Sequence, residues 1–246
     1  RRAYFADGTP LGSKDSVGGC RIDLIAQAWA ALAGLPKAKE AMDAAWEQLA
    51  DEDAGVIKLL TPPFDKDYKN PGYIAAYPPG IRENGGQYTH GACWAVMGWA
   101  KLGQAERAWR AFRMLMPYAH ADTPKGARRY RVEPYAVAGD VYGEAPHAGR
   151  GGWTWYTGAA SWLCRAAYVG LMGYEREGAR VRPAPLLPPE WNEASVVLRA
   201  GASVYTLTGR RGAAQATLDG SPLADGWVVL ADDGKAHTAV FPMRES

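Results

Sequence analysis

The stretch CRIDLIAQAWAALAGLPKAKEAMDAAWEQLA, residues 20–50, indicates the fold class of this chain. The first half carries apolar residues at spacings of three and four, the pattern of one helix face: Ile22, Ile25, Trp29 and Leu32. Gly34 is a typical helix stop, and Pro36 suits the first turn of a second helix. A further stripe marks that second helix: Met42, Trp46 and Leu49. We therefore predict two helices joined by a short turn.

The same arrangement recurs along the chain. Helical patterns cover residues 88–102 and 104–116, and a last one covers residues 154–173. Long polar connections, residues 51–88 and 118–153, separate the helix pairs, and loops of this length inside a compact domain are usually functional. A plain helical bundle would have short connections throughout. The pattern favours an α/α toroid whose long loops gather at one end.

The character of the sequence changes after Gly178. A Pro-rich bridge, residues 179–194, follows a helical portion that we place at residues 1–178. Short alternating runs then fill residues 195–246, with Asp-Gly turn signals at 219–220 and 233–234. We predict a small antiparallel β module of about five strands there.

Composition excludes several function classes. The net charge is +2, from 28 basic and 26 acidic residues, which leaves no electrostatic footprint for nucleic acid. We expect no transmembrane segment, because no apolar run is long enough to span a bilayer. The absence of CxxC and HExxH patterns argues against a metal site. The three cysteines, Cys20, Cys93 and Cys164, are predicted to be buried thiols of a reducing, cytoplasmic protein.

The aromatic residues are biased toward amphipathic types. The chain has 10 Trp and 13 Tyr but only 4 Phe. Trp and Tyr combine a flat apolar face with a polar edge, which suits the faces and hydroxyl rims of sugar rings. Ordinary packing accounts for most of them individually.

Two glycine-rich strings, YPPGIRENGGQYTH (77–90) and HAGRGGWTWYTG (147–158), precede predicted helices. Thr157 and Gly158 stand near a helix start, where free amides and the helix dipole attract anions. His90 stands in a matching place, so the two helix starts could share one anion. The alternative is that a backbone carbonyl simply satisfies the His90 imidazole, and taken alone the sequence favours this alternative.

These strings, with VEPYAVAGDVYG (132–143) and IDLIAQAWAALAG (22–34), resemble the C-terminal catalytic-barrel segments of the inverting β-glycoside phosphorylase family. Cellobiose and chitobiose phosphorylases belong to that family. The wording most resembles the branch of the cyclic β-1,2-glucan synthases and β-1,2-oligoglucan phosphorylases. The resemblance runs from Tyr4 to about Trp191. It implies a mainly α fold, a partial (α/α)6 barrel followed by the β module.

The resemblance also implies an activity. Phosphate would attack the anomeric carbon of a β-glucoside and give α-glucose 1-phosphate with inversion. In this branch of the family the implied substrate class is β-1,2-glucan. Phosphate-binding residues by motif would be His90, Thr157 and Gly158. Substrate-binding residues would be Arg82, Glu83 and Gln87. No cofactor is implied, with inorganic phosphate as co-substrate and a β-glucan oligosaccharide as the partner substrate.

The family's general acid lies in a D-W-N-D-G motif that would precede the segment at Tyr4, and this chain contains no such motif. We therefore assign no catalytic residue and expect the isolated chain to be inactive or incomplete. We expect it to need the N-terminal half of the barrel, or another chain, on its open face. Asp23 is expected to favour a helix start. Glu133 and Asp140 are expected to make loop hydrogen bonds or sugar contacts rather than to replace the acid.

Two other functions stay open from the sequence. One is a non-catalytic sugar-binding fragment. The other is an α/α-toroid glycoside hydrolase, which would need a base to activate water. The predicted location is the cytoplasm, including the cytoplasmic part of a larger membrane-associated enzyme.

Overall fold

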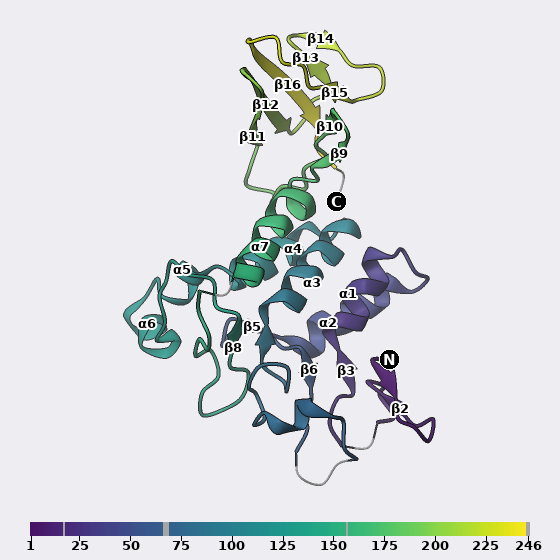
Figure 1. Ribbon diagram of the computed structural model, residues 1–246, viewed down its shortest axis with the longest axis vertical. Helices are drawn as coiled ribbons and strands as arrows, with labels where there is room; N and C mark the ends of the chain where they lie inside the picture. Colours follow the sequence, from purple (N-terminus) through teal and green to yellow (C-terminus); the bar gives the residue numbers. More distant parts are fainter. Residues whose placement is uncertain (17, 66–68, 156, 245–246) are drawn as a thin grey trace. The chain divides into compact units, whose positions relative to one another are not determined.

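The computed structural model describes residues 1–16, 18–65, 69–155 and 157–244, which form two compact units (Figure 1). The first unit comprises Arg1–Leu102 and Arg107–Ala166. The second comprises Gly103–Glu106 and Ala167–Ser246. The candidate functional residues lie in the first unit.

The predicted helices are present with shifted ends. The α-helices are α1 Leu24–Leu32, α2 Ala38–Leu49, α3 Thr89–Lys101, α4 Ala105–Met114, α5 Pro117–His120, α6 Pro124–Tyr130 and α7 Thr157–Arg165, and η1 (Tyr73–Ala76) is a 3₁₀ helix. Helix α1 begins late because Asp23 is its N-cap, accepting a hydrogen bond from the Ala26 amide. The last predicted helix continues beyond α7 as a π-helix, η2 (Ala166–Leu171).

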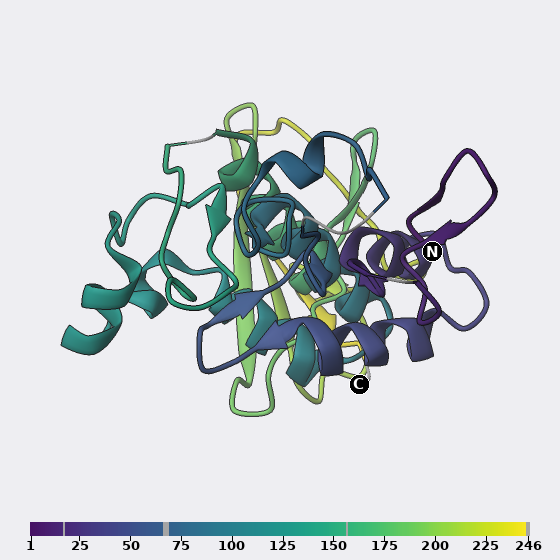
Figure 2. The same cartoon turned by 90° about the horizontal axis from the view of Figure 1, so that it is seen from below.

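The helical core forms where α1 packs against α2 and α3, and α3 packs against α7 (Figures 1 and 2). The Trp99 indole of α3 is fully buried and donates to the Met42 carbonyl of α2 at 3.1 Å. The predicted apolar stripe of α1 is only partly buried: Ile22 is buried, whereas Trp29 is 47% exposed. The buried face carries Leu24, Ala28 and Ala31 instead. Its alanines allow α1 to pack closely along α3.

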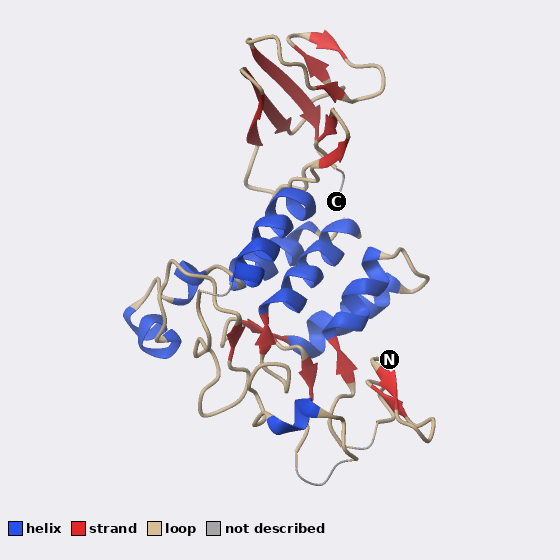
Figure 3. Ribbon diagram, viewed as in Figure 1, coloured by secondary structure: helices blue, strands red, loops and turns tan. Residues whose placement is uncertain are grey.

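Short antiparallel ladders connect the segments outside the helices of the first unit. They are β1 (Ala3–Tyr4) with β2 (Pro10–Leu11), β3 (Ile22–Asp23) with β6 (Leu60–Thr61), β4 (Ala50–Asp51) with β5 (Val56–Ile57), and β7 (Gln87–Tyr88) with β8 (Asp140–Val141). Ladders β3–β6 and β7–β8 lie at the end of the helices where α1 and α3 begin (Figure 3). The β7–β8 ladder joins the two long loops to each other. It decides which polar residues meet.

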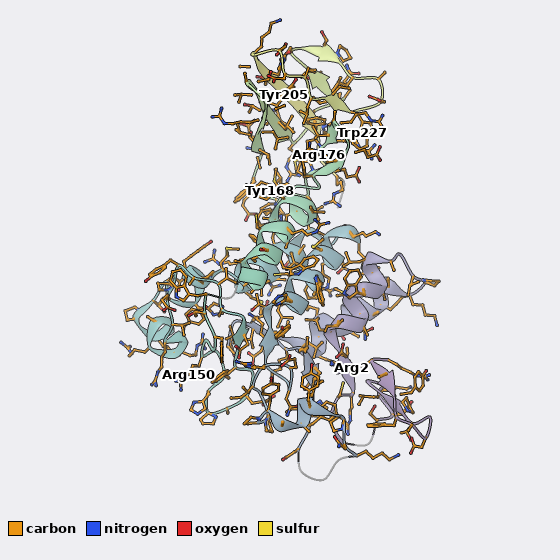
Figure 4. The ribbon with its side chains drawn as sticks, viewed as in Figure 1. Arg2, Arg150, Tyr168, Arg176, Tyr205 and Trp227 are labelled. Atoms are coloured by element: carbon orange, nitrogen blue, oxygen red, sulfur yellow. The ribbon has the colours of Figure 1, made fainter. Side chains whose placement is uncertain are left out.

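The second unit is a β module with its own core. One sheet contains β9 (Glu175–Glu177), β10 (Arg180–Arg182) and β15 (Val228–Val229). The other has the order β11 (Glu193–Ala200), β12 (Ser203–Arg210), β16 (Ala236–Pro242), β13 (Thr217–Leu218) and β14 (Ser221–Pro222). Tyr205, labelled in Figure 4, is buried in this core with Leu207 and Phe241.

Two details of the predicted β module need correction. The module is not purely antiparallel, because β12 and β16 pair in parallel. The tight turn after β11 forces an antiparallel partner, whereas residues 211–235 are long enough to return the chain in the parallel direction. The predicted Pro-rich bridge over residues 179–194 contains strand β10, which pairs with β9 and β15.

Among the helices of the described ranges, none combines the length and apolar character that a bilayer crossing requires.

Candidate active site

The first long loop is closed by a buried side chain, Asn84. Its Oδ1 accepts from the Phe64 amide at 2.7 Å, and its Nδ2 donates to the Phe64 and Tyr77 carbonyls at 2.9 and 2.8 Å. These bonds hold the RENGG string in a compact turn in which Arg82 adopts a left-handed backbone conformation, φ 49°. The turn places the Arg82 and Glu83 side chains against one cavity.

The second long loop reaches the same place through strand β8. Asp140 lies opposite Tyr88 in the β7–β8 ladder. The Thr89 amide donates to the Gly139 carbonyl at 3.0 Å, and the Thr89 hydroxyl donates to the Ala138 carbonyl at 2.6 Å. The start of α3 is thereby bonded to the residues before Asp140. Asp140 and His90, which are far apart in the sequence, therefore line the same cavity.

The cavity at this junction has a volume of about 180 Å³. Its lining residues come from both loops and from α3: Arg82, Glu83, Tyr88, His90, Gly139, Asp140 and Trp153. The Arg82 guanidinium lies 4.5 Å from the centre of the Trp153 ring, within cation–π distance. Trp153 is 55% exposed, so an aromatic face, a cation and two carboxyls border the same hollow.

Three buried polar atoms of this lining have no hydrogen-bond partner among the described residues: Glu83 Oε2, His90 Nδ1 and Asp140 Oδ2. An unsatisfied buried polar atom costs about 1–3 kcal/mol. Folded proteins contain few such atoms. Three of them around one cavity are typical of a site whose partners come from a ligand. The interpretation of His90 as an imidazole satisfied by a backbone carbonyl is wrong for its Nδ1.

His90 also contacts the start of α7. A Cβ atom added at Gly158 would lie 2.7 Å from His90 Nε2, so only glycine leaves room for the imidazole. The ring stacks on Tyr88 with 5.0 Å between centroids. Burial lowers the pKa of His90, which favours the neutral ring. Because the first amides of a helix have no intrahelical partner, the imidazole and these amides can serve one anion.

Not every predicted site residue lies at the cavity. The side chain of Thr157 lies outside the part of the chain that the structure describes. Gln87 is buried, and its Oε1 accepts from the Ile57 amide at 2.9 Å, which ties strand β7 to β5. It does not belong to the cavity lining given above. The structure thus brings together Arg82, Glu83, His90 and Gly158.

The three carboxyls weighed as substitute acids differ in environment. Asp23 caps α1 and pairs with Arg2, as predicted for a helix-start carboxylate. Hydrogen bonds from its own amide, from Thr154 and from Trp155 lower the pKa of Glu133. Asp140 is the opposite case. Burial raises its pKa, against the opposing effect of its hydrogen bond from the Trp153 amide.

The sequence singled out Asp140 for a loop hydrogen bond or a sugar contact, but it did not single out Trp153, which lines the same cavity. The Trp153 amide donates to Asp140 Oδ1 at 3.0 Å, which fixes the carboxyl under the second loop. A Cβ at Gly152 would lie 2.4 Å from Asp140 Oδ2, so this glycine allows the loop to close over the carboxyl. The available signal was a charged residue inside an apolar run followed by paired glycines.

None of the three cysteines belongs to the lining of this cavity. Cys20 and Cys93 are buried, and burial raises the pKa of each to about 12. Cys164 is exposed, so its predicted burial is wrong; α7 buries Ala159 and Leu163 on its other face. Within the described ranges, no three His, Cys, Asp or Glu residues come together as a metal site.

Comparisons with known proteins agree with the motifs. Residues 1–173 match the family model of the glycosyl hydrolase 94 superfamily, catalytic domain. The chain is 49% identical over 211 residues to the cyclic beta-(1,2)-glucan synthase NdvB of Rhizobium meliloti (strain 1021), which covers 85% of this chain and 7% of the relative. It is 28% identical over 250 residues to solabiose phosphorylase of Paenibacillus borealis, a match that covers 98% of this chain and 32% of the relative.

A third relative is N,N'-diacetylchitobiose phosphorylase of Vibrio proteolyticus, 25% identical over 232 residues that cover 90% of this chain and 28% of the relative. The chain spans less than a third of the length of each of these three relatives. The predicted family resemblance is confirmed.

Proposed function

The chain belongs to the glycosyl hydrolase 94 superfamily, and on this premise we propose that it is part of an enzyme that phosphorolyses β-glucosides with inversion. The products would be α-glucose 1-phosphate and a shortened acceptor sugar. Relatives named as phosphorylases support the reaction class. The relative named as a cyclic beta-(1,2)-glucan synthase supports β-1,2-glucan as the substrate class.

The observation that carries the proposal is the contact between His90 and the first turn of α7. A Cβ atom built at Gly158 would lie 2.7 Å from His90 Nε2, so the imidazole lies next to helix amides that can bind an anion. Burial lowers the pKa of His90 and so favours the neutral imidazole, which offers one N–H donor to a phosphate oxygen. We assign phosphate to this corner, and the family motif assigns Thr157 to the same phosphate site.

The chemistry explains why an anion site suffices on this side. A phosphate oxygen forms a bond to C1 while the glycosidic C1–O bond breaks, and the leaving oxygen takes a proton. Phosphate is already a nucleophile, so no base is required, in contrast to an inverting hydrolase that must activate water. The protein has to hold phosphate in line with the breaking bond, and such positioning is a large part of catalysis.

The sugar side of the cavity is assigned to Glu83 and Arg82, with the exposed face of Trp153 beside them. A carboxylate accepts hydroxyl protons, and an indole face packs on sugar C–H groups. Gln87 supports this loop through its bond to the Ile57 amide. The proton donor is not assigned to Glu133, whose lowered pKa keeps it ionised. We propose that a further segment or chain supplies the acid.

Phosphate binding tests the assignment directly. The purified chain is titrated with inorganic phosphate and with α-glucose 1-phosphate, followed by calorimetry. We expect His90→Ala to weaken phosphate binding by tenfold or more. The matched control is His147→Ala, because His147 lines a different hollow of about 270 Å³ that is rich in arginine: Arg128, Arg129, Arg131 and Arg150. Of these residues, Arg150 is labelled in Figure 4. Equal effects of the two substitutions would contradict the assignment.

Turnover tests the reaction. The chain is incubated with phosphate and β-1,2-linked gluco-oligosaccharides, alone and with a polypeptide that supplies the remaining catalytic region of a relative. We expect α-glucose 1-phosphate only from the mixture. Glucose release that does not depend on phosphate would indicate a hydrolase. Sugar binding without turnover in the completed mixture would indicate a binding fragment.

A further inference from the structure

Asp140 is the most deeply buried charged residue at the candidate site, with 3% of its surface exposed. Its two carboxyl oxygens have different surroundings. Oδ1 accepts from the Trp153 amide at 3.0 Å. Oδ2 is buried and has no hydrogen-bond partner in the described parts of the chain, and the residue itself lines the cavity. One oxygen therefore anchors the side chain, and the other is left for something that enters the cavity.

Glu83 repeats this feature on the opposite loop. Its Oε2 is buried and is likewise unpartnered within the described residues. The two carboxyls are close enough that the Glu83 charge adds to the burial that raises the pKa of Asp140. A pair of like charges with unfilled acceptor positions is unfavourable in the empty cavity. The Arg82 guanidinium offsets part of this repulsion.

The chemistry of the missing partner follows from these groups. An ionised carboxylate only accepts hydrogen bonds, so the ligand must donate them. A cation would do so, but the Arg82 guanidinium already lies at this wall, over the Trp153 ring. An uncharged molecule with adjacent hydroxyl groups can donate to both carboxylates without adding charge. A hexose has such hydroxyls, and its C–H face matches the exposed indole of Trp153.

We propose that Asp140 is a second sugar-binding residue of this site, whose Oδ2 accepts one hydroxyl proton of the hexose that also binds Glu83. The inference rests on the proposed function, which assigns Glu83 to the acceptor sugar. It adds a specificity-determining contact: the hydroxyl that meets Asp140 must be present and correctly oriented. Gly152 is required for the same contact, because a Cβ at this position would lie 2.4 Å from Asp140 Oδ2 and would block the carboxyl.

The test is a thermodynamic cycle that combines a change of the Asp140 side chain with removal of single sugar hydroxyls and compares the binding affinities. Glucose and its 2-, 3-, 4- and 6-deoxy analogues are titrated into the 246-residue chain, and binding is followed by NMR shifts of the tryptophan indoles. Asp140→Asn is the variant, because its amide oxygen still accepts from the Trp153 amide. Asp122→Asn, which changes an exposed carboxylate of the same unit, is the matched control.

We expect the wild-type chain to lose tenfold or more in affinity for one particular deoxy sugar, as is typical of a hydrogen bond to a charged group. Asp140→Asn should lose a similar factor for glucose and lose nothing further for that deoxy sugar. Retained protection of the Trp153 amide from hydrogen exchange shows that the variant is folded.

Three results would overturn the inference: no glucose binding by the wild-type chain, no effect of Asp140→Asn, or an equal loss for all five sugars. Phosphate titration distinguishes failure of this inference from failure of the proposed function. If His90→Ala abolishes phosphate binding while Asp140→Asn has no sugar-specific effect, the phosphorylase assignment stands and only the role of Asp140 is wrong.

Discussion

Replacing Gly158 with alanine tests the geometry on which the phosphate site depends. In an unobstructed helix, Gly→Ala stabilises by up to about 1 kcal/mol. Here the new Cβ would lie 2.7 Å from His90 Nε2, which is 0.7 Å short of the 3.4 Å at which ordinary contact begins. Either the imidazole or the first turn of α7 must move.

The cost of that movement decides the sign of the effect. Overpacking typically costs about 1–3 kcal/mol. The His90 ring is restrained by its stack on Tyr88, so it cannot tilt away without losing that contact. We expect Gly158→Ala to lower the free energy of unfolding by about 1 kcal/mol and to weaken phosphate binding. Urea denaturation and calorimetry measure the two effects.

A double-mutant cycle isolates the cause. Once His90→Ala has removed the imidazole, Gly158→Ala should no longer destabilise the chain and should stabilise it through helix propensity. The coupling between the two substitutions should be at least about 1 kcal/mol. Ala160→Gly, on the exposed face of α7, is the control for propensity without steric overlap. Additive effects of Gly158→Ala and His90→Ala would refute the reasoning.

Three further predictions concern titratable groups. Burial raises the pKa of Asp140, so its contribution to stability is lost as pH rises through the folded-state pKa. Urea denaturation should therefore show that Asp140→Asn stabilises the chain by about 1 kcal/mol at pH 7. The stabilisation should become smaller as pH falls toward 4. Hydrogen bonds from His237 to Asp219 and Asp233 raise the pKa of that imidazole, so the stability that it provides is present below its ordinary pKa of about 6.5 and is lost as pH rises through the folded-state value. An NMR titration of His237 should show a midpoint above 6.5 that Asp219→Asn lowers, and an unchanged midpoint would argue against the ion pair. Cys164 alone should react with a thiol reagent in the native chain, because the other two thiols are buried; reaction of all three without unfolding would contradict the described packing.

Local pattern was sufficient for the elements and the family. Spacings of three and four along residues 20–50 predicted α1 and α2, because helix formation depends on neighbours within one or two turns. Asp23 was recognisable as a helix-start carboxylate for the same reason. The glycine-rich strings identified the family, since their residue types and order are specific.

Periodicity could not tell which face of α1 is buried. The stripe containing Trp29 and the face containing Ala28 have the same helical period. The choice depends on α3, which packs closely only on the side with small residues. The direction of β16 is a second example, because the strand pattern is the same whether its partner runs parallel or antiparallel.

Some features of the candidate site could be predicted from the sequence, and others depend on the tertiary structure. The sequence indicated that His90 and Gly158 both stand near helix starts. Only the tertiary structure placed the imidazole against that glycine, directed Gln87 to the Ile57 amide, and brought Asp140 into the cavity through the β7–β8 ladder. Burial and unsatisfied hydrogen bonds arise from residues far apart in the chain, so a linear pattern of residue types does not contain them.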